Sequence, residues 1–140
     1  MDCIFCNIIK GDSAAEILYR DEKVISFLDI RPVNLGHTLV VPIEHHSNFE
    51  EMPDDLLAYM FPLLRDISVA VKKGTGAEGF NVICNNGKTA GQTVFHCHYH
   101  IIPRFDSDLI RYKIDFKSYS REELNHYGNL IRNSLRNNNG

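Results

Sequence analysis

The sequence predicts an α+β fold with a mainly antiparallel sheet, because of the order in which its elements occur. Three strand-like segments come first, a long amphipathic helix follows, and two further strands precede a last helix. Strands that occur in runs, without a helix between each pair, favour antiparallel neighbours over parallel βαβ units. The chain has 140 residues, which is the length of one domain.

The composition is that of an ordinary globular protein. Hydrophobic residues make up 44% of the chain, and 15 basic side chains face 18 acidic ones. The net charge of −3 argues against a protein that binds nucleic acid by neutralising phosphates. No apolar run approaches the ~20 residues that span a bilayer, and the first residues lack the basic start and apolar core of a secretory signal. We therefore expect a cytoplasmic protein with no nucleic-acid or membrane partner.

The first part of the chain predicts a short helix and three strands. A helix over 3–9 ends at Gly11, and strands over 16–19 and 24–28 flank a turn-like segment. Proline and glycine make 31–36 a loop. The β-rich run 37–41 stops at a proline and predicts the third strand.

The long helix is predicted over 53–73. Pro53 suits its first turn, and Asp54 and Asp55 suit the positive end of the helix dipole. Pro62 falls inside this helix, so we expect a kink or a local break there. Apolar residues at three- and four-residue spacing form one stripe that faces a core, namely Leu56, Met60, Leu63, Leu64, Ile67 and Val71.

The second half of the chain predicts two strands and a last helix. The strands cover 79–85 and 95–104, and a glycine-containing loop at 86–91 follows the first of them. Ser120 and Glu123 have the spacing of a capping box, which begins a helix that runs to about 135.

Three histidines at every second position are the most informative feature of the sequence. On a strand, alternate side chains share a face, so His96, His98 and His100 lie together while Cys97 and Tyr99 face a core. The outer two histidines are then about 13 Å apart, at a rise of about 3.3 Å per residue. One ion with bonds of about 2 Å cannot bind all three. Nucleophilic or acid–base chemistry is the interpretation that remains.

Such chemistry suits attack on phosphorus. A neutral imidazole whose N–H is held by a carbonyl presents its other nitrogen as a nucleophile, and attack on phosphorus then forms a phosphoryl-histidine. The step needs donors for the nonbridging oxygens and a proton for the leaving group. Gln92 and backbone N–H groups near Gly91 would supply neutral donors, and Thr93 or His100 would deliver the proton.

Cys3 and Cys6 have the spacing of half a metal site. Two cysteines on a short apolar helix can equally be core residues, and no βαβ pattern surrounds them to favour a redox pair. His45 or His46, in the loop after the third strand, could complete a tetrahedral zinc site together with His96. From the residues alone, both the structural and the metal-binding interpretations stay open.

The pattern His-X-His-X-His followed by two apolar residues resembles the signature of the histidine triad (HIT) family. Segments 27–32, 36–42 and 85–95 are similar to its nucleotide-binding Hint/PKCI-like branch, of the bacterial type. The resemblance implies a five-stranded antiparallel sheet with two helices, paired about a two-fold axis into a ten-stranded homodimer. It makes 1–140 a single HIT domain, with the Cys-X-X-Cys segment at 1–11 and a variable C-terminal region at 106–140.

The resemblance also implies roles for individual residues. Family members hydrolyse or transfer nucleotidyl groups at the α-phosphate of purine nucleotides. His98 would be the nucleophile that becomes adenylyl-histidine, and His100 would contact the phosphate or the leaving-group oxygen. Thr93 stands where this branch often has serine; its hydroxyl still delivers a proton, and its extra methyl is expected to slow bulky leaving groups. The implied nucleotide-binding residues are Phe27 and Ile30 at the base, Asp29 at the ribose, Asn85 at the phosphate or ribose, and Gln92, Thr93 and His100 at the phosphate.

By the same resemblance Cys3, Cys6, His45 and His96 would hold a structural zinc ion, and the chemistry itself requires no cofactor. The expected substrate is a purine nucleoside phosphoramidate or a related AMP conjugate. Two alternatives are a dinucleoside polyphosphate hydrolase, as in the Fhit branch, and a non-catalytic nucleotide-binding adaptor. A metal-dependent hydrolase is a further, minor alternative.

Overall fold

The computed structural model describes residues 2–138, which form two compact units, one reaching Leu109 and the other starting at Ile110. The described part of the first unit contains the sheet, two α-helices and two short 3-10 helices; that of the second contains one α-helix. Within residues 2–138, no helix combines the length and the apolar character needed to cross a membrane.

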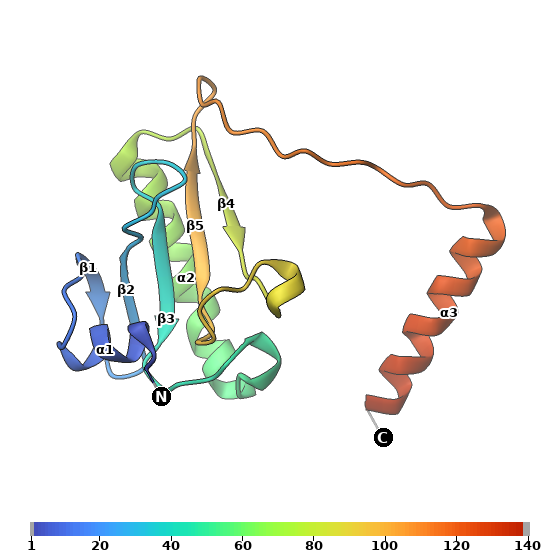
Figure 1. Cartoon of the computed structure of the whole chain (residues 1–140), viewed down its shortest axis with the longest axis horizontal. Helices are drawn as coiled ribbons and strands as arrows, with labels where there is room; N and C mark the ends of the chain where they lie inside the picture. Colours follow the sequence, from blue (N-terminus) through green and yellow to red (C-terminus); the bar gives the residue numbers. More distant parts are fainter. Residues whose placement is uncertain (1, 139–140) are drawn as a thin grey trace. The chain divides into compact units, whose positions relative to one another are not determined.

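The first unit is built on an antiparallel sheet of five strands in the order β1-β2-β3-β5-β4 (Figure 1). Strand β5 lies between β3 and β4, because the long helix after β3 leads the chain to the far edge of the sheet. This confirms the α+β class and the five-stranded antiparallel sheet. The strands are β1 (Ile17–Arg20), β2 (Val24–Leu28), β3 (Thr38–Pro42), β4 (Gly79–Ile83) and β5 (Tyr99–Arg104).

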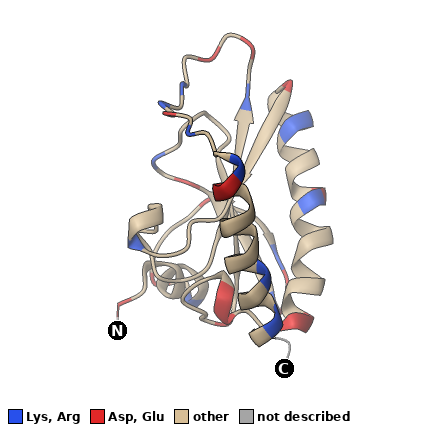
Figure 2. Cartoon of the chain, turned by 90° about the vertical axis from the view of Figure 1, so that its right-hand side faces the viewer, with Lys and Arg blue, Asp and Glu red and all other residues tan. Residues whose placement is uncertain are grey.

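Helix α2 (Asp54–Thr75) packs on one face of the sheet (Figure 1). Its predicted apolar stripe is buried or half-buried against the strands, and acidic residues lie at its start and lysines at its end (Figure 2). Negative charge at the start of a helix and positive charge at its end both interact favourably with the helix dipole. The core on this face joins Met60 and Leu64 of the helix to Val40, Tyr99 and Ile101 of the sheet.

Helix α2 is continuous through Pro62, so the local break that the sequence allowed is absent. A proline inside a helix removes one backbone hydrogen bond. Pro62 lies on the exposed side, whereas Met60 and Leu64 on either side of it are buried in the core. Packing of the buried stripe therefore holds the helix together across the proline.

Helix α1 (Ile4–Lys10) belongs to a second core on the opposite face of the sheet. Phe5 and Ile8 pack there with Ile25, Phe27 and Leu39 from β2 and β3. The helix ends at a glycine with a φ of +86°, a backbone conformation that residues with side chains rarely adopt.

Strand β5 begins at Tyr99, four residues later than the sequence predicted. The pairing with β4 ends at His100, opposite Ile83, and the pairing with β3 ends at Tyr99, opposite Val40. Before this point the N–H of Cys97 donates instead to the carbonyl of His46, at 2.7 Å. His96 and His98 therefore lie on an extended segment that leads into the strand. Likewise, β4 ends at Ile83 and not at 85.

The second unit consists of segment 110–120, which has no regular secondary structure, and helix α3 (Arg121–Asn138). The predicted capping box is confirmed. The N–H of Ser120 donates to the Glu123 carboxylate at 2.9 Å, and the N–H of Glu123 donates to the Ser120 hydroxyl at 3.2 Å. The two bonds satisfy backbone and side-chain groups at the start of the helix.

Met60 is the central contact between α2 and the sheet, and its side chain is fully buried. We expect Met60→Ala to lower the free energy of unfolding by about 2–5 kcal/mol, because it removes buried methylenes and leaves a cavity. Urea unfolding followed by circular dichroism measures this loss. Val69→Ala, on the exposed face of the same helix, is the matched control, with an expected change within about 0.5 kcal/mol. Equal effects of the two substitutions would contradict this packing.

Candidate active site

The extended segment into β5 sorts its side chains onto two faces, as the sequence predicts. Cys97 and Tyr99 join the core under α2. On the other face, the rings of His98 and His100 are in edge contact at 4.9 Å between centroids. The ring of Phe5, from α1, contacts the rings of both His98, at 4.9 Å, and His96, at 5.9 Å. The alternation therefore continues beyond the hydrogen-bonded strand.

His98 is held by the backbone of its own segment. Its Nδ1 lies 2.7 Å from the carbonyl oxygen of His96. A carbonyl only accepts, so Nδ1 carries the proton and Nε2 keeps its lone pair. The side chain is only 7% exposed, and this burial lowers the pKa of His98 below its ordinary value. The ring is therefore neutral at pH 7, with an unprotonated nitrogen available for attack.

His100 contacts a histidine that the sequence did not assign. Its Nδ1 lies 2.9 Å from Nε2 of His37, which precedes β3. Burial, with the nearby His98 and His37, lowers the pKa of His100 to about 4, and burial also lowers the pKa of His37. The Asp29 carboxylate lies 3.6 Å from His37 Nε2. The pairing of β3 with β5, which sets Leu39 opposite His100, brings these groups together.

An apolar recess of about 90 Å³ is built from the second core and opens near Asp29 and Ile30. Ile30 is 84% exposed at its rim, whereas Phe27 is buried in its wall. The apolar lining suits contact with the face of an aromatic ring. Phe27, Asp29 and Ile30 are the residues that the sequence predicts here. Side chains of α1 and β3 were not predicted, and the only sequence signal for those of α1 is the apolar spacing on a short helix. The missed residues are Ile4, Phe5, Ile8 and Leu39.

Two of the predicted phosphate-binding residues, Gln92 and Thr93, are neighbours in the loop before the histidines but differ in burial. Gln92 is 3% exposed and makes hydrogen bonds within the protein: its amide nitrogen donates to the carbonyls of Ser47 and Val94, and its oxygen accepts from the N–H of Gly87. It thereby holds the loop closed. Thr93 is exposed beside a second recess of about 450 Å³ that also includes Cys3, Ile4 and His45.

Asn85 lies at the start of the same loop, where its side chain faces Gly91. A Cβ added to Gly91 would lie 3.8 Å from the Asn85 amide nitrogen, and Gly91 has a φ of +94°. The loop thus depends on glycine at this position. The Asn85 amide is half-buried beside the loop.

Four predicted metal ligands converge at the start of α1. The sulfur and Nδ1 atoms of Cys3, Cys6, His45 and His96 all lie within 4.8 Å of one another. His96 Nδ1 is 3.4 Å from Cys3 Sγ and 3.6 Å from Cys6 Sγ, and His45 Nδ1 is 3.4 Å from Cys6 Sγ. Tetrahedral zinc with ordinary bond lengths separates sulfur and nitrogen ligands by about 3.6 Å. The four residues fit zinc.

The surroundings also suit a metal. The Nε2 of His96 donates to the carbonyl of Pro42 at 2.8 Å, which leaves Nδ1 free to bind an ion. Burial lowers the pKa of His96 to about 4, so its ring is neutral at pH 7. His46 does not join the cluster, since its Nε2 faces the Glu44 carboxylate at 3.7 Å. The tertiary structure therefore selects His45 from the two candidates that the spacing allowed.

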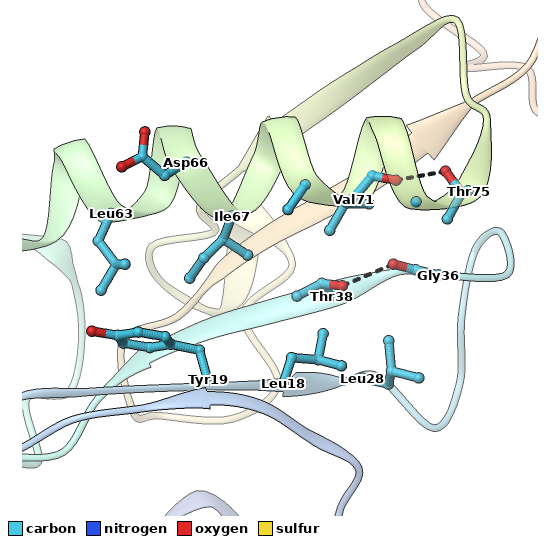
Figure 3. Close-up of a pocket in the computed structure, with 12 residues that line it drawn as sticks. Leu18, Tyr19, Leu28, Gly36, Thr38, Leu63, Asp66, Ile67, Val71 and Thr75 are labelled. Carbon is cyan, nitrogen blue, oxygen red and sulfur yellow. Dashed lines mark hydrogen bonds between the residues drawn. The ribbon is translucent and has the colours of Figure 1, made fainter.

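A larger pocket of about 550 Å³ lies on the α2 face, between the helix and strands β1 and β2 (Figure 3). Leu18 and Leu28 line it from the sheet, and Leu63, Ile67 and Val71 from the helix. Its threonine hydroxyls already donate to backbone carbonyls. No histidine or cysteine lines it.

Comparisons with known proteins find relatives over most of the chain. The family model of the HIT domain matches residues 10–107. The chain is 37% identical over 138 residues to an adenosine 5'-monophosphoramidase of Schizosaccharomyces pombe, covering 97% of this chain and 100% of the other. It is 43% identical over 109 residues to an adenylylsulfatase of Arabidopsis thaliana, covering 78% of this chain and 55% of that one.

Solved structures resemble the fold closely. A member of the HIT family from Bacillus subtilis superposes with a TM-score of 0.85 at 39% identity, covering 95% of this chain and 96% of that chain. A zinc-bound histidine triad family protein from Mycobacterium smegmatis superposes with a TM-score of 0.72 at 38% identity, covering 99% and 96%.

Proposed function

This chain belongs to the HIT family, and on that premise we propose that it is a hydrolase that takes the nucleotidyl group of an AMP conjugate onto His98. Relatives named as an adenosine 5'-monophosphoramidase and an adenylylsulfatase support hydrolysis at an AMP phosphorus. We propose purine nucleoside phosphoramidates and related AMP conjugates as the substrates. The hydrogen bond from His98 Nδ1 to the His96 carbonyl is the single observation that carries the proposal.

The reaction proceeds in two displacements. Nε2 of His98 attacks the α-phosphorus, an N–P bond to His98 forms, and the bond from phosphorus to the leaving group breaks. His100 or Thr93 gives the departing amine or oxygen its proton. Water then attacks the phosphorus and gives its proton to the group that protonated the leaving group, the N–P bond breaks, and AMP leaves with His98 restored. Two in-line displacements give net retention at phosphorus, and the covalent step replaces one difficult displacement with two easier ones.

The apolar recess beside the histidines would hold the base. Phe27 and Ile30 border it, together with Phe5 from α1. Asp29 at its edge would accept hydrogen bonds from the ribose hydroxyls. Asn85 would hold the phosphate or ribose, and Gln92 would act on the phosphate through the loop that it keeps closed.

Cys3, Cys6, His45 and His96 would hold a zinc ion. Bound there, the ion supplies a structural cross-link and leaves the chemistry to His98. The ligands come from three distant segments, so the ion would fasten α1 to the loop after β3 and to the histidine segment. Phe5 lies between Cys3 and Cys6 on the same turn of helix and contacts the ring of His98. Helix α1 therefore contributes residues both to the proposed zinc site and to the apolar recess that would hold the base.

We also propose that the protein is a homodimer that pairs through β4. This strand is an edge of the sheet, and Phe80 and Val82 on it are 37% and 45% exposed. An exposed edge with apolar side chains favours pairing with a second chain. Analytical ultracentrifugation of the full chain tests this. A dimer that Val82→Lys converts to a monomer is expected, and a wild-type monomer at micromolar concentration contradicts the proposal.

The test of the enzyme is to capture the covalent intermediate. Acid-free quenching of a reaction with an AMP amidate, followed by mass spectrometry, should find one added AMP on the peptide that contains His98. Turnover of diadenosine polyphosphates measured beside that of the amidate distinguishes the polyphosphate hydrolase. Absence of any adduct and of turnover across both substrate classes would leave the nucleotide-binding adaptor.

A further inference from the structure

His37 is a buried polar side chain that the proposed chemistry does not use. It is 3% exposed and lies between the loop 29–36 and the histidine segment. The backbone fixes its position, because the N–H of Asp29 donates to the His37 carbonyl at 2.9 Å and the N–H of His37 donates to the Asn34 carbonyl at 3.0 Å. A buried imidazole held this firmly has a defined hydrogen-bond pattern on both ring nitrogens.

The direction of each hydrogen bond follows from the one group that can only donate. The backbone N–H of Val33 donates to His37 Nδ1 at 3.0 Å, so Nδ1 is unprotonated. In the neutral ring the proton is then on Nε2. That nitrogen is 2.9 Å from His100 Nδ1. His37 therefore donates and His100 Nδ1 accepts, which leaves the proton of His100 on its Nε2.

We propose that His37 is a positioning residue that holds His100 in the tautomer protonated on Nε2, so that His100 acts as a hydrogen-bond donor toward the phosphate and the leaving group. The two neighbouring histidines then have opposite tautomers. His98 presents a lone pair, because the His96 carbonyl takes its Nδ1 proton. His100 presents an N–H, because His37 occupies its Nδ1 lone pair. Two neighbouring histidines thus take different roles: His98 is the nucleophile and His100 is the proton donor.

The alternative use of these groups is a metal site, since Asp29, His37 and His100 each offer an atom within 4.8 Å of the others. A metal at this position would need lone pairs on both His37 Nε2 and His100 Nδ1. The donation from Val33 to His37 Nδ1 instead places a proton on Nε2 of the neutral ring. Both ring nitrogens of His37 and Nδ1 of His100 then have hydrogen-bond partners within the protein, and no ion is needed to satisfy them.

The tautomer can be measured without any substrate. In the full chain labelled with 15N-histidine, long-range 1H–15N correlation spectra identify the protonated ring nitrogen, and His100→Gln assigns the signals of His100. We expect His98 protonated on Nδ1 and His100 protonated on Nε2. A wild-type protein with His100 protonated on Nδ1 would overturn the proposal. Elemental analysis of Cys6→Ser, in which the proposed zinc site loses a ligand, tests the metal alternative. No bound metal, together with wild-type signals from His37 and His100, excludes it, and a metal ion that this variant retains would contradict the proposal.

Two substitutions at position 37 form a matched pair. In His37→Asn the amide oxygen can still accept from Val33, but no donor reaches His100. In His37→Gln the longer side chain places its amide group where Nε2 of His37 lies. The Asp29 carboxylate beside this place only accepts hydrogen bonds, so the amide nitrogen of the glutamine is favoured there and can donate to His100. We expect His100 to lose its single tautomer in His37→Asn and to keep it in His37→Gln. If the His100 signals of both variants are the same as those of the wild type, the positioning role is refuted.

The kinetic consequence rests on the proposed function, and it depends on the leaving group. An amine must take a proton as it leaves, whereas a nitrophenolate leaves without one. We expect His37→Asn to lower kcat for an AMP amidate about 10²-fold, with little effect on KM or on the nitrophenyl ester of AMP, and His37→Gln to recover most of that loss. Equal losses on both substrates would indicate a merely structural role. If wild type neither turns over nor forms an adduct on His98 while the spectra agree with expectation, the proposed function fails and the tautomer assignment stands.

Discussion

His98→Asn is expected to abolish turnover of AMP conjugates and to leave AMP binding intact. Asparagine has an amide in place of the unprotonated Nε2, so no N–P bond can form at this position. Loss of an enzyme's nucleophile costs about 10³-fold or more in kcat. The base recess and Asp29 do not involve the lost ring nitrogen. Calorimetric titration should therefore give an AMP dissociation constant within about threefold of wild type, which is a change below about 1 kcal/mol.

The matched control for this substitution is His126→Asn. His126 lies on α3 in the second unit and is exposed, so its removal should change neither kcat nor AMP binding. Near-ultraviolet circular dichroism of His98→Asn shows whether the buried site keeps its packing. Turnover retained within tenfold in a folded His98→Asn protein would show that another group attacks phosphorus and would overturn the proposed mechanism.

Removal of the zinc ligands gives the second large effect, on stability and nucleotide affinity together. We expect the full chain to bind about one zinc ion per protomer by elemental analysis, and Cys6→Ser to bind none. An ion present at 1,000 times its dissociation constant stabilises the folded state by about 4 kcal/mol, so the variant should unfold at a markedly lower temperature. It should also bind AMP more weakly, because Phe5 and Ile8 of the same helix border the base recess.

Cys84→Ser is the matched control for the loss of one thiol. Cys84 is half-buried against the core under α2 and is not part of the four-residue cluster. The variant should keep zinc, and hydrogen exchange should find α1 as protected as in wild type, whereas Cys6→Ser should expose the amides of α1. Full zinc content in Cys6→Ser, or equal losses in both variants, would contradict the assignment of these ligands.

Most of the element order could be predicted because each signal lies within a few residues. The apolar stripe of α2 and the capping box at Ser120 appear in the structure as the spacing predicts. Errors occurred where a distant partner decides the outcome. Residues 95–98 have a strand-like sequence, but the pairings of β5 end at His100 with β4 and at Tyr99 with β3, and the N–H of Cys97 donates to the carbonyl of His46 in the loop after β3. The expected break at Pro62 fails because residues on both sides of it pack against the sheet.

The candidate site divides in the same way. Alternation along 96–100 is a local property, so the sequence alone placed His98 and His100 on one face and Cys97 on the other. The sequence did not connect His37 with His100, which are 63 residues apart. The spacing of its residues, without the family resemblance, could not choose between His45 and His46 as the partner of the cysteines. Neither relation has a periodic signal.

By itself, then, the sequence determined the class of fold, the helix and strand types and the shared face of the histidines, because backbone hydrogen bonding and side-chain periodicity act over a few residues. The tertiary structure alone decided which partners the histidine ring nitrogens have, and it brought the four candidate zinc ligands within 4.8 Å of one another at α1. Those outcomes depend on the register of β3 against β5 and on the packing of α1 under the sheet. Burial of the two cores as a whole sets that register, so it cannot be predicted from any short segment of the sequence.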